Sequence, residues 1–394
     1  MVTGWRSVMA SPPGPDSTHR VGGYKDRLWI PRVWQGMSFL GWMRLLVRNR
    51  FRIAPRRIPL ALNVGLSGLC VSSVLWAVQE VLFGRKIQQA KIEEDPIFIL
   101  GHWRAGTTWL HELMVRDERH AYPTSYQCLA PNHFLVSRSW IGALLGLLAP
   151  SQRPQDDMPF GLERPQEEEF ALANMGLPSP YLTMVFPNHP PQYQEYLDME
   201  GVSGEALDRW KRGLLWFVKC VTFKTPKRLV LKTPPHLGRV RVLLELFPRA
   251  RFIHIYRDPY VVFASTVNVW KRFYRDQALQ VPKYEGLEEY VLETFNRMYR
   301  AFERDRGLID PSRLSEVSYE AMVADPIGQV RRIYEELGLG GFDDVRPVLE
   351  QYVASQADYR PNRYDLSPEM RAEISRRWSS FIQKYGYPSA QDED

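Results

Sequence analysis

The sequence contains little cysteine, and the cysteines it has are not spaced as metal ligands. The three cysteines lie far apart, at Cys70, Cys128 and Cys220. They form no CxxC-type pair and no disulfide framework, which excludes a cysteine-based zinc site and a disulfide-stapled secreted fold. Free thiols suit a reducing compartment, so we expect a cytoplasmic protein. We also expect no secretory signal, because the first residues lack an apolar stretch followed by a cleavage site.

Charge of one sign is not concentrated in any single block. The chain of 394 residues has 51 Lys and Arg against 45 Asp and Glu, which gives a net charge of +6. Because the basic residues are scattered, they favour a local anion site over a nucleic-acid face, and we expect no nucleic-acid partner. The hydrophobic content of 44% is that of a globular protein long enough for one large or two small domains.

Residues 58–79 contain no charged side chain, and they follow a basic run. The run comprises Arg48, Arg50, Arg52, Arg56 and Arg57. The uncharged stretch is long enough to span a bilayer, but proline, glycine and serine dilute its hydrophobicity. Three placements stay open: a helix on a membrane surface, a helix in the core, and a true span. We favour the surface helix, because a span after this basic run would place the following domain outside the cytoplasm.

These features divide the chain into three parts. Residues 1–57 form a mobile basic N-terminal segment, 58–84 an apolar helix in contact with a membrane, and 96–387 a folded domain, to which the motifs described next assign a catalytic role. We expect a cytoplasmic protein, peripheral on the inner face of a membrane.

The segment Pro96–Leu113 reads P-I-F-I-L-G-H-W-R-A-G-T-T-W-L-H-E-L and is the centre of the catalytic domain. Its apolar start has the length of a buried strand. Gly101 and Gly106 bracket a tight loop, and Thr107 begins a helix with apolar residues at helical spacing. A strand, a glycine loop and a helix N-terminus together direct backbone N–H groups and a partial positive charge at one point. The segment therefore predicts an anion-binding cradle.

This loop departs from the nucleotide-kinase pattern G-x-x-x-x-G-K-[ST]. Gly101 and Gly106 have the kinase spacing, but Thr107 occupies the lysine position, and the loop cation is Arg104. The missing lysine, and the lack of a clear Mg²⁺-binding aspartate after an apolar strand, count against a P-loop kinase. That kinase and an ordinary strand-to-helix turn stay open as alternatives.

Two further strands are expected to end near the same loop. The strand over 251–256 is followed by Arg257 and by a helix that carries Ser265, and the strand over 228–231 is followed by Lys232 and His236. In open α/β sheets, segments that leave the carboxyl ends of parallel strands line the ligand crevice. These side chains are therefore candidates for the anion site.

Together these motifs resemble sulfotransferases that use 3′-phosphoadenylyl sulfate (PAPS), in the bacterial-type branch with Arg in the loop. The loop similar to the family's 5′-phosphosulfate loop comprises Arg104, Ala105, Gly106, Thr107, Thr108 and Trp109. Ala105 replaces the usual serine. Arg257 with Ser265 resembles the family's 3′-phosphate site, and Tyr319 resembles the residue that contacts the adenine.

The resemblance implies an α/β chain with a P-loop-like sulfotransferase fold: a central parallel sheet flanked by helices, with helical insertions on the acceptor side. It implies transfer of a sulfuryl group from PAPS to a hydroxyl or amine of a small-molecule, lipid or glycan acceptor. No metal is expected. A non-catalytic nucleotide-binding protein is the remaining alternative.

Catalysis in such a family needs charge stabilisation and a base. We expect Arg104 to offset charge on the leaving phosphate. The first candidates for the base are Glu167, Glu168 and Glu169, followed by His102, His133 and His236. Arg360 and Arg363 lie where family members cover the 3′-phosphate, although the glycines of that loop are missing here. A single helix is expected over 368–385.

Overall fold

The computed structural model describes residues 32–141, 161–356 and 364–390. Two expectations lie outside them: the state of the segment before residue 32, and the roles of Arg360 and Arg363.

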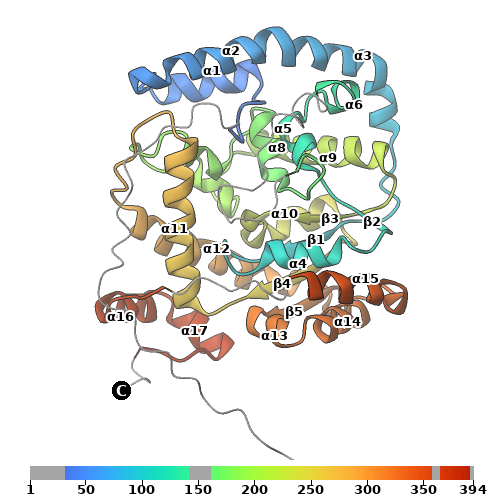
Figure 1. Cartoon of the computed structure of the whole chain (residues 1–394), viewed down its shortest axis with the longest axis vertical. Helices are drawn as coiled ribbons and strands as arrows, with labels where there is room; N and C mark the ends of the chain where they lie inside the picture. The colour runs from blue at the N-terminus through green and yellow to red at the C-terminus, as the bar shows by residue number, and fades with distance from the viewer. Residues whose placement is uncertain (1–31, 142–160, 357–363, 391–394) are drawn as a thin grey trace, which may run out of the picture. The chain divides into compact units, whose positions relative to one another are not determined.

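A five-stranded parallel sheet is the centre of the unit 31–394, as predicted (Figure 1). The strands, in the order in which they pair, are β2 (His120–Ala121), β3 (Arg228–Lys232), β1 (Ile97–Leu100), β4 (Arg251–Tyr256) and β5 (Leu314–Ser318). The short strand β2 was not expected from the sequence. Because β1 lies between β3 and β4, the chain changes direction across the sheet beside β1, which is the usual place for a ligand crevice.

Side chains alternate between the two faces of the sheet. In β1, Ile97 and Ile99 belong to the apolar cluster that includes residues of α4 and of α13–α15, whereas Phe98 and Leu100 belong to the larger cluster on the opposite face. All four are fully buried. Burial on both faces explains why the strand reads as a continuous apolar run.

Helices cover both faces of the sheet (Figure 1). One face carries α4 (Thr107–Met114), α13 (Tyr319–Ala324), α14 (Pro326–Glu336) and α15 (Phe342–Ser355). The larger cluster includes residues of α9 (Gly204–Lys224), α10 (Val240–Leu246), α11 (Pro259–Gln277) and α12 (Leu287–Asp305). A helical insertion between β2 and β3 contains α5 (Ser125–Leu129), α6 (Phe134–Ser137), α8 (Glu168–Asn174), η3 (Pro180–Met184) and η4 (Gln194–Leu197). Short turns complete the domain: η5 (Pro234–Gly238), η6 (Arg306–Leu308) and η7 (Pro311–Arg313).

The apolar N-terminal stretch forms a long helical run that follows α1 (Phe39–Arg48). The run consists of η1 (Pro55–Arg57), α2 (Ile58–Ser67), the π-helical turn η2 (Gly68–Ser72) and α3 (Ser73–Gln89). Within the described residues it is the one helix whose length and hydropathy suffice to cross a membrane, and 17% of its most apolar window is buried.

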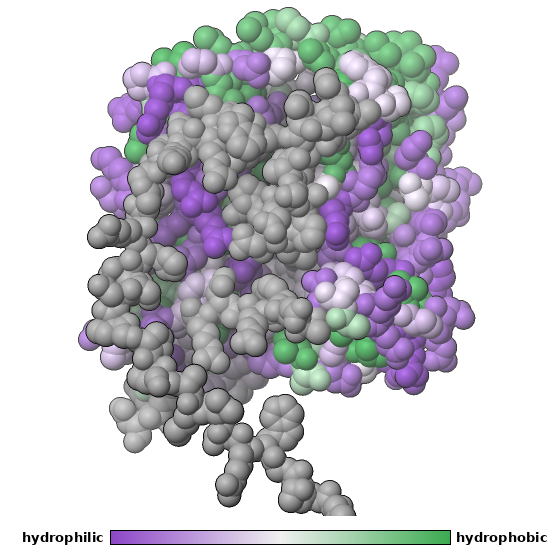
Figure 2. Space-filling view, viewed as in Figure 1, coloured by the Kyte–Doolittle hydropathy of each residue, from purple (hydrophilic) through white to green (hydrophobic). Residues whose placement is uncertain are grey.

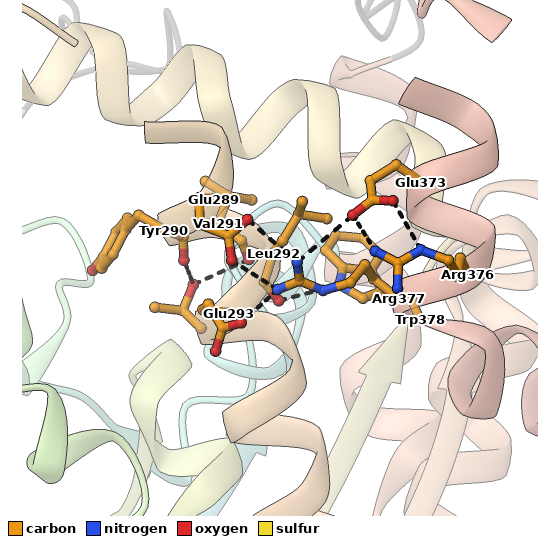
Figure 3. Close-up of polar contacts among 10 residues, drawn as sticks. Glu289, Tyr290, Val291, Leu292, Glu293, Glu373, Arg376, Arg377 and Trp378 are labelled. Carbon is orange, nitrogen blue, oxygen red and sulfur yellow. Dashed lines mark hydrogen bonds and ion pairs between the residues drawn. The ribbon is translucent and has the colours of Figure 1, made fainter. Parts of the chain in front are cut away.

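The single C-terminal helix expected over 368–385 is two helices, α16 (Pro368–Arg377) and α17 (Ser379–Tyr385). Trp378 separates them. Its ring stacks on Phe295 at a centroid distance of 3.7 Å, and its indole N–H donates to the carbonyl of Leu292 (Figure 3). This packing of Trp378 against α12 interrupts the helix. The helical periodicity of the sequence does not reveal the interruption, because the contact is with a distant segment.

Arginine–carboxylate pairs hold α16 against α12 (Figure 3). The guanidinium of Arg377 lies 2.8 Å from a carboxylate oxygen of Glu289 and 2.5 Å from one of Glu293. Glu373 also pairs with Arg377 and with Arg376. The pairs join a helix near the C-terminus to one that packs on the sheet.

Candidate functional site

The loop after β1 has a backbone that requires glycine at both ends. Gly106 has a φ of 101°, and a Cβ there would lie 2.4 Å from a ring carbon of Tyr319. A Cβ on Gly101 would lie 2.7 Å from the carbonyl oxygen of Ile255. Arg104 also adopts a left-handed conformation, with a φ of 68°, which costs a side-chain-bearing residue about 1–2 kcal/mol. This backbone strain falls on Arg104, the loop residue that the sequence predicts to be functional.

The other loop residues complete the predicted strand–loop–helix unit. Ala105 is buried, and its N–H donates to the carbonyl of His102 at 3.1 Å. Thr107 is buried, while Thr108 and Trp109 are half-buried. As first residues of α4, Thr107 and Thr108 place their N–H groups at the open helix end, where they lack partners within the helix.

Residues far apart in the sequence meet at this loop. Arg104 Nε donates to Ser265 Oγ at 2.7 Å, and Arg257 Nη1 donates to the carbonyl of Arg104 at 3.2 Å. The Arg257 guanidinium carbon lies 3.9 Å from the ring centroid of Tyr319, whose ring centroid is 6.1 Å from that of Trp109. The structure therefore brings the predicted 5′-loop, the predicted 3′-phosphate pair and Tyr319 into one cluster.

This cluster is strongly cationic. Among the described residues, no ion pair joins Arg104 or Arg257 to a carboxylate. Two guanidinium groups beside a helix N-terminus raise the local positive potential, and arginine binds phosphate in a two-pronged geometry. The arrangement fits a ligand with several negative charges.

Glu167 is the member of the predicted acidic trio that lies beside the loop. Its Oε1 accepts from Lys232 Nζ at 2.6 Å, and its Oε2 accepts from the hydroxyl of Tyr181. Lys232 Nζ also donates to Thr108 Oγ1 at 3.3 Å, so a single lysine connects Glu167 with the first turn of α4. The Glu167 side chain remains 15% exposed.

Glu168 and Glu169 are fully buried and point toward other partners. Glu168 Oε1 lies 2.6 Å from His236 Nε2. Burial opposes ionisation of Glu168, but the charge and hydrogen bond of His236 together with backbone and Thr233 contacts hold its pKa below the usual value. Glu169 binds both terminal nitrogens of Arg239, at 2.6 and 3.1 Å. These pairs tie α8 to η5 and the following residue, which leaves Glu167 as the trio member that lies beside the loop.

The histidine candidates are poorly placed to act as bases. Burial lowers the pKa of His102 to about 3 and that of His133 to about 4. Both side chains are almost fully buried, and His236 is held by Glu168. A group with so low a pKa is a weak acceptor of protons near neutral pH.

Tyr181 and Trp103 support Glu167, and neither role was predicted from the sequence. Trp103 Nε1 donates to the Tyr181 hydroxyl at 2.9 Å, and that hydroxyl donates to Glu167. Burial, followed by the charge of Glu167, raises the pKa of Tyr181 well above its usual value, so the hydroxyl keeps its proton as a donor. No local motif marks Tyr181, because its contact depends on how η3 folds back onto α8.

Comparison with known proteins gives results consistent with this geometry. A profile of the Sulfotransferase family matches residues 96–344. The omega-hydroxy-beta-dihydromenaquinone-9 sulfotransferase Stf3 of Mycobacterium bovis is 47% identical over 371 residues, 94% of this chain and 95% of that protein, and the Mycobacterium tuberculosis protein of that name gives the same values.

Two solved structures share the fold. Sulfotransferase STF9 of Mycobacterium avium superposes with a TM-score of 0.64 at 18% identity, covering 90% of this chain and 98% of that one. Sulfotransferase STF1 of M. tuberculosis H37Rv gives 0.60 at 18% identity, with coverage of 87% and 92%. The predicted fold and family are thereby confirmed, and a P-loop kinase is disfavoured. This chain belongs to the sulfotransferase family.

Proposed function

We propose that this protein transfers a sulfuryl group from PAPS to a hydroxyl group of a lipid-like acceptor, without a metal ion. The observation that carries the proposal is the contact of Arg104 with Ser265, beside Arg257. This contact joins the loop after β1, which suits a 5′-phosphosulfate, to the residues Arg257 and Ser265, which suit a 3′-phosphate. A nucleotide that carries negative charge at both positions fits the combined site.

Each part of the nucleotide has residues suited to it. The helix-end N–H groups and the hydroxyls of Thr107 and Thr108 suit the 5′-phosphate. Arg257 and Ser265 suit the 3′-phosphate, and the aromatic pair of Tyr319 and Trp109 beside the loop is the candidate contact for the adenine.

In the reaction, the acceptor oxygen attacks sulfur, the bond from sulfur to the phosphate oxygen breaks, and the acceptor proton leaves. Arg104 is placed to offset the charge that develops on the departing phosphate. Glu167 takes the proton, because it combines partial exposure with fixed orientation by Lys232 and Tyr181. The products are a sulfate ester and adenosine 3′,5′-bisphosphate (PAP). Catalysis of this kind depends mainly on positioning and electrostatics.

The acceptor proposal rests on the curated relative. The name of the 47% identical protein specifies an ω-hydroxylated menaquinone, which is a lipid with a terminal hydroxyl. We therefore propose a hydroxyl on a long apolar molecule as acceptor. A water-soluble donor and a lipid acceptor meet at a bilayer surface, so we propose that the enzyme works in the cytoplasm, peripheral on the inner face of a membrane, with 58–84 in contact with it.

The test is turnover with labelled PAPS across a panel of acceptors: an ω-hydroxylated menaquinone, a sterol, a short-chain alcohol and a sugar. We expect a sulfated product and PAP with the quinone, without Mg²⁺. Glu167→Gln should lower kcat by about 100-fold or more, within the usual contribution of a general base. Glu118→Gln, which changes an exposed carboxylate outside this cluster, is the matched control.

A thermal-shift binding assay tests donor recognition separately from turnover. PAP should raise the melting temperature of the wild type, whereas ATP with Mg²⁺ should do so less. Stronger stabilisation by ATP with Mg²⁺, or no transfer to any acceptor despite PAP binding, would contradict the enzyme proposed here.

A further inference from the structure

The helical run Pro55–Gln89 has its polarity reversed relative to a helix of a soluble protein. Its buried stripe, at helical spacing, carries mainly small or polar residues. The stripe includes Ala61, Val64, Gly68, Ser72 and Gln79. Most of the large aliphatic side chains point outward, with Leu62 61%, Leu66 62% and Val81 85% exposed, whereas Leu60, Val64 and Ile87 are buried. In water the large apolar residues would be buried, so the outer side of this helix suits an apolar environment.

The run is fastened to the protein at its beginning, middle and end. Trp42 Nε1 donates to the carbonyl of Ala61 at 3.1 Å. A Cβ on Gly68 would lie 3.0 Å from the Met37 carbonyl oxygen, and Gln79 Oε1 accepts from the N–H of Leu135 at 2.9 Å. Near the C-terminal end, Lys219 Nζ donates to the carbonyl of Gln88. The helix therefore lies along the domain, with one side on protein and the other exposed.

Helix α1 and the turn after it add to the same surface. Leu40, Val47 and Phe51 are exposed by 65%, 59% and 53%. Arg50 and Phe51 both have a φ of 51°, a left-handed turn that ends α1. Figure 2 shows hydrophobic residues gathered over the part of the molecule where Figure 1 places α1, α2 and α3.

Positive charge borders this apolar surface. Exposed arginines lie on α1, in the turn after it and at the start of the run; they are Arg44, Arg48, Arg50, Arg52 and Arg56. Residues 28–79 contain no Asp or Glu, and Glu80 is the one carboxylate residue within the run. The border is therefore cationic without local compensation by acidic residues of the same segment.

We propose that α1 and the run Pro55–Gln89 form a docking platform that lies flat on an anionic bilayer, with the outward aliphatic residues among the acyl chains and the arginines at the headgroups. The proposal rests on the membrane contact proposed above and deepens it, since it assigns the orientation of the helices and the lipid charge that this surface recognises. A bilayer suits both features, because it offers an apolar layer beneath negative charge.

Other occupants suit the platform less well. In a symmetric contact between two copies of this chain, the arginines of one copy would face the same arginines of the other, and this repulsion is unfavourable. A spanning helix would lose the contacts of Ala61, Gly68, Gln79 or Gln88 with the domain. At about 1.5 Å per residue, 35 residues also extend about 52 Å, well beyond the hydrocarbon thickness.

The experiment is flotation of the full chain with vesicles of phosphatidylcholine alone and of phosphatidylcholine with 30% phosphatidylglycerol. The platform variant is L62Q/L66Q/V81Q. The matched control is L308Q/V323Q/V348Q, which changes three exposed aliphatic residues on η6, α13 and α15. We expect the wild type and the control to float with anionic vesicles, and the platform variant to bind at least about 100-fold more weakly.

A charge variant, R44Q/R50Q/R52Q, should lose at least about tenfold in affinity for anionic vesicles and little for neutral ones. All variants should keep the thermal shift with PAP, which shows that they fold and separates this proposal from the function. No vesicle binding by the wild type, equal loss in the control, a platform-dependent dimer in sedimentation, or resistance to alkaline carbonate extraction would each overturn the flat docking.

Discussion

The exchange of Glu169 for Gln tests whether Glu169 has a structural role, in contrast to Glu167, the proposed base. Glu169 and Arg239 are both fully buried, and the carboxylate receives two N–H bonds from the guanidinium at 2.6 and 3.1 Å. Ser179 Oγ donates a third hydrogen bond at 2.7 Å. The amide of Gln has nearly the same shape but no charge, so Glu169→Gln leaves the Arg239 charge buried without its partner.

The size of the effect follows from that burial. Removing one partner of a buried ion pair costs about 3–5 kcal/mol, because the remaining charge has lost its compensation. For a chain of 394 residues the loss corresponds to a decrease in Tm on the order of 4–6 °C. The kcat of the folded enzyme should change by no more than a few-fold, since the Glu169 carboxylate contacts Arg239 and Ser179 rather than the loop.

The assay combines thermal melts, urea unfolding and initial rates for Glu169→Gln and Glu167→Gln. Glu350→Gln breaks an exposed pair with Arg346 and serves as the control, with no measurable change expected in Tm. The double variant E169L/R239M should recover much of the stability, because it removes both charges. A stable Glu169→Gln protein with a kcat reduced 100-fold would refute the division of roles between the two acids.

Four further perturbations test the nucleotide site and the buried loop histidine. Arg257→Ala should weaken PAP binding by about 2–4 kcal/mol in calorimetry, the range for one partner of a desolvated charge pair; unchanged affinity would remove it from the 3′-phosphate site. Arg104→Ala should lower kcat about 100-fold or more, whereas a higher KM for PAPS at normal kcat would assign it to ground-state binding. Gly106→Ala should abolish the PAP-induced thermal shift, because its Cβ would collide with the Tyr319 ring. The native pKa of His102 is about 3 and its unfolded value 6.5, so the unfolded chain binds the proton first, and stability should fall as pH drops below 6.5, by up to about 1.4 kcal/mol per pH unit. Urea midpoints should show a smaller pH slope in His102→Gln.

The nucleotide loop could be read from the sequence because its chemistry is local. A buried strand, two glycines at a fixed spacing and a helix start lie within 96–113. The strand over 97–100 and the start of α4 at Thr107 agree with that reading. Likewise Arg257 directly follows a strand and Ser265 lies on the next helix, so a spacing of eight residues sufficed to predict that both lie near the loop, where each contacts Arg104.

The roles of Glu167, Glu168 and Glu169 could be separated only in three dimensions. The three acids are adjacent in the sequence and identical in chemistry. Successive side chains at the start of a helix point in directions about 100° apart, so one carboxylate faces Lys232 and the loop while the others enter the interior. Which direction leads to the site is set by the packing of α8 against distant segments.

The apolar stretch over 58–79 shows the same difference between what the sequence and the tertiary structure determine. The sequence alone determined that 58–79 carries no charge and follows a basic run, which favoured a surface helix but left a core helix and a span open. Only the tertiary structure decided which side of the helix contacts protein: a stripe of mainly small and polar residues lies against α1, α6 and α9, and most of the large aliphatic residues face outward. Composition gives the types of side chain in the stretch but not the directions in which they point. Those directions are set by the helices that the folded chain packs against one side of the run.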